Sequence, residues 1–205
     1  MGDLSVVVGT TPAYQCAALQ HHRRTPGGGA SRLRQTRIRN DIAILRLTRS
    51  VAGIDHVAGV KVPPLNQEPP IGAVLQTVVW SRTQEEVVEP LRTIPLKIMN
   101  REKCRRALGS QTIPSSQICT ENDDGGPCSG DGGGPLVLRR INGDYLVGLS
   151  SYGTKGCHPG TADVFTKVSH YLDWILRTVD SASPASSGSA SGSQRRTTPS
   201  PSIGS

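Results

Sequence analysis

Aromatic residues are scarce in this sequence: one phenylalanine, Phe165, accompanies two tryptophans and four tyrosines in 205 residues. Hydrophobic residues make up 35% of the chain, so a core would consist mainly of valine, isoleucine and leucine. The length suits one ordinary domain or two small ones, with enough chain to bury a sizeable core.

Long apolar runs are also missing. No stretch of about eighteen apolar residues occurs, so we expect no membrane-spanning segment. The first residues, MGDLSVVVGTTP, lack the basic and then apolar layout of a secretory signal, and taken alone this indicates the cytosol.

The five cysteines include no C-x-x-C pair of the kind that zinc sites use, and we predict neither a metal site nor a cofactor. An odd number of cysteines at wide spacing favours disulfides plus one unpaired thiol, and hence an oxidising compartment. Buried unpaired thiols are the alternative, because spacing alone does not exclude them. The five are Cys16, Cys104, Cys119, Cys128 and Cys157.

The net charge is +7, and the surplus is concentrated in residues 21–49. Such a segment could bind a polyanion, but a solvated surface loop is the favoured interpretation. No aromatic residues interleave the arginines, which argues against nucleic acid as the partner. The segment holds Arg23, Arg24, Arg32, Arg34, Arg37, Arg39, Arg46 and Arg49 against one acid, Asp41.

Short apolar segments separated by turn residues predict an all-β barrel or sandwich. The predicted strands are 4–10, 41–47, 73–80, 145–152 and 163–168, and the glycine-rich stretch closed by Pro135 leads into a further apolar strand. Between them, residues 20–37 are predicted to form an exposed basic loop and residues 59–72 an extended connection with four prolines.

One helix is predicted at residues 169–179, SHYLDWILRTV, with Ser169 as its cap and Asp173 near its positive end. From Ser181 the composition becomes serine-rich, and residues 181–205 cannot bury enough apolar surface to offset the entropy of ordering. We predict a disordered tail there.

Several motifs occur together in a fixed order. CSGDGGGPLVL resembles the Gly-Asp-Ser-Gly-Gly-Pro signature of the trypsin/chymotrypsin family of serine proteases, and RNDIAILRL resembles the strand that carries its catalytic aspartate. LVGLSSYG is similar to the family's substrate-binding strand, and CHPGTADVFTKVSHYLDWI to its closing segment. The resemblance covers about residues 4 to 178.

The family fold is two six-stranded barrels with the active site between them. The resemblance therefore implies an incomplete first barrel, a complete second barrel and a C-terminal helix, within a domain of residues 1–180. It implies the disulfides Cys104–Cys119 and Cys128–Cys157 and leaves Cys16 without a partner. Leu75 and Leu138 stand where many members have a further disulfide, so an apolar contact would replace it.

Peptide hydrolysis in this family needs a serine nucleophile, a histidine base, an aspartate that orients the histidine, and backbone amides for the oxyanion. By resemblance Asp41 is the triad aspartate, Ser151 supports it, and Gly130 belongs to the oxyanion hole. The nucleophile position is Gly132, which has no side chain to attack a carbonyl. Ser129 is displaced by three residues, and its hydroxyl would point elsewhere.

The catalytic histidine is also missing. The family carries it in an Ala-Ala-His-Cys motif before the strand that LSVVVGT resembles, so that motif would lie upstream of Met1. The chain's histidines are His21 and His22 in the basic loop, and His56, His158 and His170, which follow Asp41 and match no catalytic position.

The same upstream segment would supply the freed amine that pairs with the aspartate at position 131. A buried carboxylate without a counter-charge is costly. Asp131 is therefore exposed, or bound by local donors, or part of a longer protein.

The resemblance assigns Gly126, Tyr152, Gly153 and Asp163 to a substrate-binding pocket. Gly126 stands where trypsin-like members have an aspartate, and Asp163 where many have glycine. The pocket would keep an acid on the opposite wall and prefer a basic side chain. Alternatively, Asp163 is a solvated turn residue.

These features favour a catalytically inactive serine protease homologue, a binding or regulatory module of extracellular proteolysis with protein or peptide ligands. The alternatives are a serine endopeptidase whose sequence is truncated and altered at position 132, and a basic polyanion-binding protein. The resemblance implies secretion although no signal peptide is present in the sequence.

Overall fold

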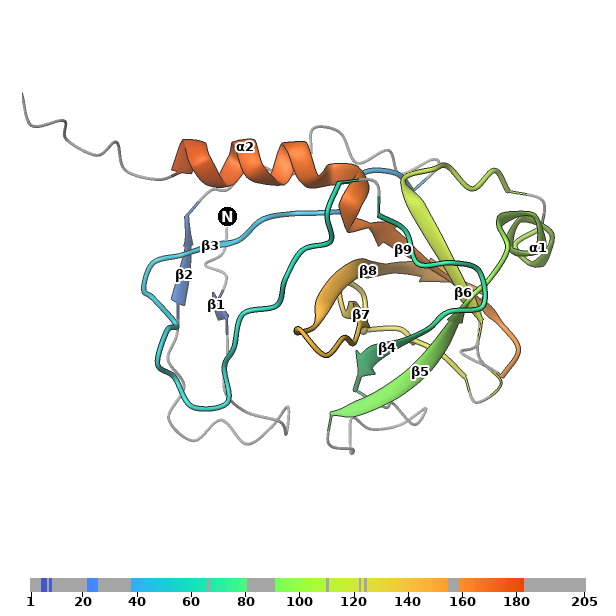
Figure 1. Cartoon of the computed structure of the whole chain (residues 1–205), viewed down its shortest axis with the longest axis horizontal. Helices are drawn as coiled ribbons and strands as arrows, with labels where there is room; N and C mark the ends of the chain where they lie inside the picture. Colours follow the sequence, from blue (N-terminus) through green and yellow to red (C-terminus); the bar gives the residue numbers. More distant parts are fainter. Residues whose placement is uncertain are drawn as a thin grey trace, which may run out of the picture.

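The computed structural model describes residues 5–6, 8, 22–25, 38–65, 67–80, 91–109, 111–121, 123, 125–154 and 159–182. They form a three-stranded sheet and a closed six-stranded barrel (Figure 1). The strands are β1 (Ser5–Val6), β2 (His22–Thr25), β3 (Arg46–Leu47), β4 (Val74–Val79), β5 (Arg92–Ile98), β6 (Gln117–Glu121), β7 (Pro135–Leu138), β8 (Tyr145–Gly153) and β9 (Ala162–Lys167). The helices are α1 (Arg101–Ala107), the short 3₁₀ helix η1 (Val168–Tyr171) and α2 (Leu172–Ala182).

The barrel has the strand order β4-β5-β6-β9-β8-β7 and is antiparallel throughout. Buried residues alternate with exposed or half-buried ones along β4, as expected for a strand with one face toward a core. Leu75, Leu96, Leu136 and Phe165 are each at most 1% exposed and pack in one cluster. The predicted second barrel and its aliphatic core are confirmed.

The N-terminal sheet differs from the predicted pattern. Residues 20–37 were expected to be a loop, but β2 lies within them and pairs with both β1 and β3. The predicted strand 41–47 is reduced to β3 and an isolated bridge residue, Ala43. Strand pairing uses backbone N–H and C=O groups and does not require apolar side chains. The polar composition of residues 20–37 therefore led to the wrong prediction of a loop where β2 lies.

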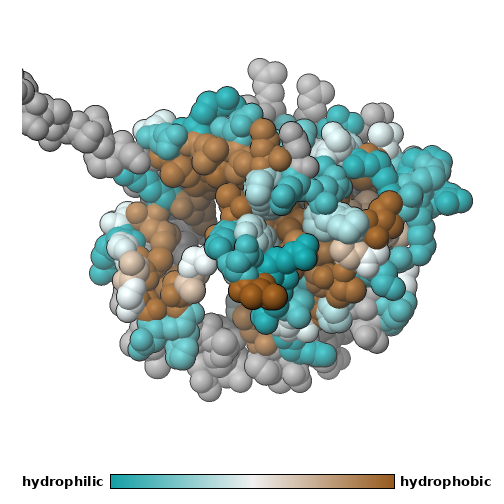
Figure 2. Space-filling view, viewed as in Figure 1, coloured by the Kyte–Doolittle hydropathy of each residue, from teal (hydrophilic) through white to brown (hydrophobic). Residues whose placement is uncertain are grey.

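The C-terminal helix was predicted, but its start was wrong. Ser169 is 4% exposed within η1 and does not cap α2, while Asp173 lies in the first turn of α2 as expected. Leu176 and Val179 are 51% and 50% exposed, and Figure 2 shows apolar surface gathered along this helix. No helix among the described residues is long and apolar enough to cross a membrane.

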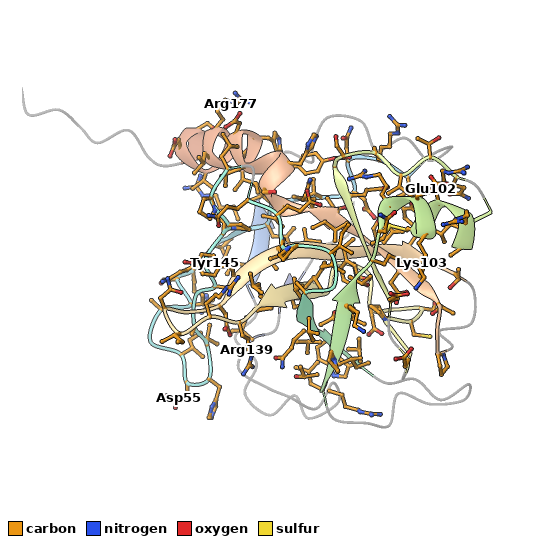
Figure 3. The ribbon with its side chains drawn as sticks, turned by 45° about the vertical axis from the view of Figure 1, so that its right-hand side comes forward. Asp55, Glu102, Lys103, Arg139, Tyr145 and Arg177 are labelled. Carbon is orange, nitrogen blue, oxygen red and sulfur yellow. A yellow bond between two sulfur atoms is a disulfide. The ribbon has the colours of Figure 1, made fainter. Side chains whose placement is uncertain are left out.

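The helix α1 was not predicted, because its sequence, REKCRRA, is short, mostly charged and has no large apolar residue. In the structure, Cys104 is its one buried residue. Its start is fixed by Asn100, whose side-chain oxygen accepts a hydrogen bond from the Glu102 amide at 2.7 Å. Glu102 also forms two hydrogen bonds with Arg105. Figure 3 labels Glu102 and Lys103 on this helix, and Lys103 forms an ion pair with Glu121 of β6.

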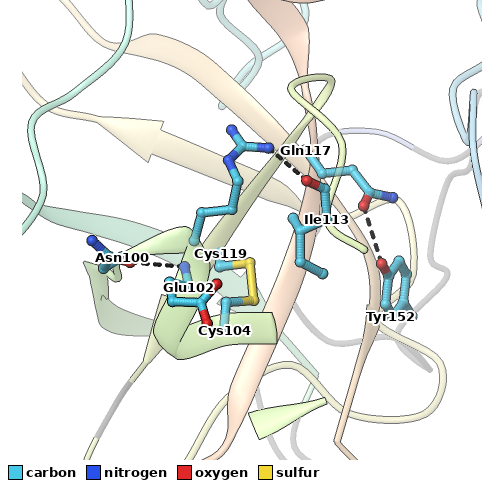
Figure 4. The surroundings of a disulfide bond; sticks show 8 residues. Asn100, Glu102, Cys104, Ile113, Gln117, Cys119 and Tyr152 are labelled. Carbon is cyan, nitrogen blue, oxygen red and sulfur yellow. Dashed lines mark hydrogen bonds between the residues drawn. A yellow bond between two sulfur atoms is a disulfide. The ribbon is translucent and has the colours of Figure 1, made fainter. Parts of the chain in front are cut away.

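A disulfide fastens α1 to the barrel. Cys104 is bonded to Cys119 of β6, as the resemblance implied (Figure 4). Cys128 is also disulfide-bonded, and its expected partner Cys157 lies outside the described residues, as does Cys16.

Leu75 and Leu138 lie on adjacent strands. The register Gln76↔Val137 makes them the next opposing pair of β4 and β7. Leu75 is buried, and Leu138 packs against the same cluster. An apolar contact therefore stands at the position of the family's further disulfide.

Candidate functional site

Asp41 is held against the barrel by hydrogen bonds from two strands. The Ser151 hydroxyl on β8 donates to Asp41 Oδ2 at 2.7 Å, and the Thr166 hydroxyl on β9 donates to the Asp41 carbonyl at 2.8 Å. Its neighbour Asn40, at φ 57°, accepts a hydrogen bond from the Tyr171 hydroxyl. The carboxylate is thus fixed in a geometry suited to orienting a base.

Asp131 is buried, with 8% of its surface exposed, and is satisfied locally. Its Oδ1 accepts the Trp80 amide at 3.0 Å and its Oδ2 accepts the Cys128 amide at 2.8 Å. Of the three possibilities raised by the sequence, the structure shows local donors. Two backbone amides can stabilise a buried carboxylate by charge-assisted hydrogen bonds.

The loop 128–134 is closed by backbone hydrogen bonds. Gly130 and Gly133 have φ of 104° and 83°, values that favour glycine. The Asp131 amide donates to the Cys128 carbonyl, and the Gly133 amide to the Ser150 carbonyl. These bonds fix the loop that carries Gly132 against β8.

Gly132 is different from its glycine neighbours. A Cβ at this position would have no atom within 4 Å, and the φ of Gly132 lies outside the left-handed region. The backbone would therefore accept a serine without strain. Ser129 is exposed and borders the same pocket, three residues away along the chain.

A pocket of about 400 Å³ opens beside this loop. Tyr152, Gly153 and Asp163 line it, together with Gly130 and Gly132. The structure thus brings Tyr152, Gly153 and Asp163 together with the nucleophile loop, whereas Gly126 is not among the lining residues and lies behind the Asp163 carboxyl.

Asp163 occupies the space that two glycines leave free. A Cβ on Gly126 would overlap Asp163 Oδ2, and a Cβ on Gly153 would lie 2.5 Å from Asp163 Oδ1. Asp163 is 5% exposed, so it is not a solvated turn residue. Burial raises the pKa of Asp163 from its ordinary value of 3.8 to about 7.

Tyr152 is fixed by a residue that sequence reasoning missed. Its hydroxyl donates to Gln117 Oε1 at 3.0 Å, and Gln117 Nε2 donates to the Ile38 carbonyl at 3.0 Å (Figure 4). Burial raises the pKa of Tyr152, while the Gln117 hydrogen bond and Arg39 oppose the shift. No sequence motif identifies Gln117, because its contacts with Tyr152 and Ile38 join residues that are far apart in the chain.

Two histidines have described side chains, His56 and His170. Both are exposed, and His170 packs edge-on against Tyr171 with ring centres 5.0 Å apart. Neither ring forms a hydrogen bond with Asp41 in the described part of the chain. His21 and His158 lie outside that part, and only the backbone of His22 is described.

Two further features lie apart from this site. A pocket of about 540 Å³, larger than the first, is lined by Pro63, Pro64 and Tyr145, and holds none of the predicted site residues. The arginine-rich segment has described side chains only for Arg39, Arg46 and Arg49. Over the described ranges, no three His, Cys, Asp or Glu side chains are grouped to hold a metal ion.

A closed antiparallel barrel, a C-terminal helix and an aspartate–serine pair beside a pocket define a trypsin-like fold. The family model described as "Trypsin" matches residues 5–175. The chain belongs to the trypsin family of serine proteases.

Curated relatives agree with this assignment. The chain is 33% identical over 141 residues to phenoloxidase-activating factor 1 of Holotrichia diomphalia, with 66% of this chain and 39% of the relative covered. It is 34% identical over 140 residues to trypsin-1 of Astacus astacus, covering 66% of this chain and 58% of the relative. It is 35% identical over 147 residues to the proclotting enzyme of Tachypleus tridentatus, covering 66% and 38%. The chain therefore spans roughly two fifths to three fifths of these relatives.

Proposed function

We propose that this chain is a non-catalytic serine protease homologue that binds a peptide or protein ligand in its pocket. The observation that carries the proposal is Gly132, which leaves the nucleophile position without a hydroxyl. In a serine protease, loss of the nucleophile lowers turnover by about six orders of magnitude, or about 8 kcal/mol of barrier. The remaining amides and pocket cannot recover that loss.

The pocket supports a ligand with a basic side chain. The Asp163 carboxyl lies on its wall, and Gly126 and Gly153 leave the carboxyl room. A guanidinium or ammonium group reaching Asp163 would gain a charge-assisted hydrogen bond in a buried setting. Equal binding of peptides ending in lysine and leucine would contradict this preference.

An extracellular regulatory role fits two kinds of observation. Disulfide-bonded Cys104 and Cys119 are typical of oxidising compartments. Two relatives are named for an activating factor and a proclotting enzyme. We accordingly propose that this chain acts within extracellular proteolysis by binding rather than by cleavage.

The test compares turnover and binding in the same purified sample. A fluorogenic peptide with lysine before the scissile bond should remain intact, and a fluorophosphonate probe should not label the chain. The lysine-ended product peptide should bind, and Asp163→Asn should weaken its binding. Peptidase turnover that survives removal of contaminating proteases would refute the proposal.

A serine endopeptidase is the second candidate. It is favoured by the intact Asp41–Ser151 hydrogen bond and by a backbone at Gly132 that accepts a serine. An upstream exon could supply the histidine and the activation site, but it could not supply the serine. Resequencing codon 132 distinguishes the two candidates, since a serine codon would be required.

A polyanion-binding function is the third candidate, and it rests on the arginines of residues 21–49. It predicts retention on heparin that falls steeply with salt. Replacing Arg32, Arg34, Arg37 and Arg39 together should then abolish retention, and unchanged retention would eliminate this function.

A further inference from the structure

Three buried polar atoms lack a hydrogen-bond partner within the described residues, and they come from neighbouring positions. They are Asp163 Oδ2, Thr120 Oγ1 and Thr154 Oγ1. Thr120 is the direct cross-strand partner of Asp163 between β6 and β9, and the Thr154 amide donates to the carbonyl of the adjacent Ala162. Buried polar atoms are normally hydrogen-bonded, so three unsatisfied atoms at neighbouring positions require an explanation.

Two of these three residues border the pocket beside the Gly132 loop. Thr154 and Asp163 line it. The Thr154 hydroxyl and the Asp163 carboxyl can both accept N–H groups from a cation in this pocket. Thr154 Oγ1 and the Asp163 carboxyl therefore provide, at the pocket wall, acceptors for a guanidinium or ammonium group.

No described cation neutralises Asp163. Burial alone accounts for its raised pKa. The titratable groups on the elements packed against Asp163 do not supply a positive charge to its carboxyl, because each is uncharged at neutral pH, acidic, or bonded to another residue. They are Tyr152, whose hydroxyl bonds Gln117; Glu121, paired with Lys103; Asp131, bonded to two backbone amides; Asp41, bonded to Ser151; and Arg39, which acts on Tyr152.

A carboxyl in these surroundings holds its proton until a positive charge arrives, because ionisation in a buried site without a partner is costly. We propose that the pocket exchanges a proton for a cationic side chain: a guanidinium or ammonium group enters, and the Asp163 proton leaves to solvent. The inference rests on the proposed ligand-binding function and adds its control by pH. The only covalent bond that breaks is the O–H bond of the Asp163 carboxyl. The positive charge of the ligand enters the pocket as the positive charge of the proton leaves it.

The coupling makes a quantitative prediction. Below about pH 7 the ligand must displace a bound proton, so its affinity falls roughly tenfold for each pH unit. Above that pH the carboxyl is already ionised and the affinity levels off. An uncharged ligand of the same shape gains nothing from ionisation, and its affinity does not fall with acidity.

The experiment is calorimetric titration of the full chain with benzamidine, whose amidinium stays charged throughout. Heats are measured in pairs of buffers with different ionisation enthalpies, at about pH 5.5, 7 and 8.5. We expect close to one proton released per ligand at the lowest pH, about half near pH 7 and almost none at the highest. Benzamide, the neutral isostere, should release none.

Two variants assign the proton to its residue. Asp163→Asn should abolish proton release and the pH dependence of the Kd for benzamidine. His158 and Lys155 lie in a segment outside the described residues, and His158→Ala and Lys155→Ala should each leave proton release unchanged. Loss of release in His158→Ala, with release retained in Asp163→Asn, would overturn the assignment to Asp163.

The remaining outcomes distinguish failure of the proton exchange from failure of the proposed ligand-binding function. Benzamidine binding with no proton release and a constant Kd overturns the exchange and leaves the ligand preference standing. No benzamidine binding at any pH overturns both the exchange and the basic-ligand preference. Peptide turnover would overturn the non-catalytic function alone, because proton exchange at Asp163 does not depend on Gly132.

Discussion

Replacing Asp163 by asparagine should make the protein more stable at alkaline pH. The folded state holds the pKa of Asp163 at about 7, compared with 3.8 for an unperturbed carboxyl. Between those values the folded chain binds one proton more than the unfolded chain, so stability falls as the pH rises. At about 1.36 kcal/mol for each pH unit, the loss is about 4 kcal/mol above pH 7. Asparagine does not titrate and avoids this loss.

The assay is urea unfolding of the unligated protein, followed by circular dichroism at several pH values. The free energies of unfolding of the variant and the parent should be close near pH 4 and differ by about 4 kcal/mol above pH 8. Asp55→Asn is the matched control, because Asp55 is an exposed carboxylate that points away from the barrel (Figure 3). Parallel curves for Asp163→Asn and the parent across the whole range would refute the reasoning.

Three further substitutions test the fold and the site. Gly132→Ser should change the free energy of unfolding by less than about 0.5 kcal/mol, because a Cβ there meets open space; it should not hydrolyse a fluorogenic lysine peptide, and turnover would show that a working histidine is present. Leu75→Cys combined with Leu138→Cys should form a disulfide that stabilises the oxidised form over the reduced form by about 4 kcal/mol in urea unfolding, whereas two free thiols after oxidation would show that the register is wrong. Cys104→Ala combined with Cys119→Ala should cost about 3 kcal/mol in the same assay, and a loss under 1 kcal/mol would show that the crosslink contributes little.

The second barrel could be predicted from sequence because its strands carry their own signals. Residues 73–80 and 145–152 are short, largely apolar segments with turn residues at both ends, and the structure has β4 and β8 there. Asp163 could be placed in a pocket only through resemblance, since it differs from Asp55 in burial and not in type.

Other elements depend on contacts that a sequence does not display. The strand β2 exists because two partners supply backbone hydrogen bonds, and its sequence, HRRT, resembles a loop. The helix α1 is short and polar, and its cap residue Asn100 was the one available signal. The link from Gln117 to Tyr152 joins residues 35 positions apart, so neither residue identifies the other.

The hydrogen bonds around Asp41 have a mechanical consequence that is independent of chemistry. Residues 38–41 are tied to the second barrel by Gln117 of β6, Ser151 of β8, Thr166 of β9 and Tyr171 of η1. Peeling this segment away breaks four bonds at once, each with a net value of about 1 kcal/mol. The segment is therefore attached to three strands of the barrel and to η1 at the same time. The Asp41 carboxylate supplies one of these four bonds, and it does so whether or not any peptide bond is cut.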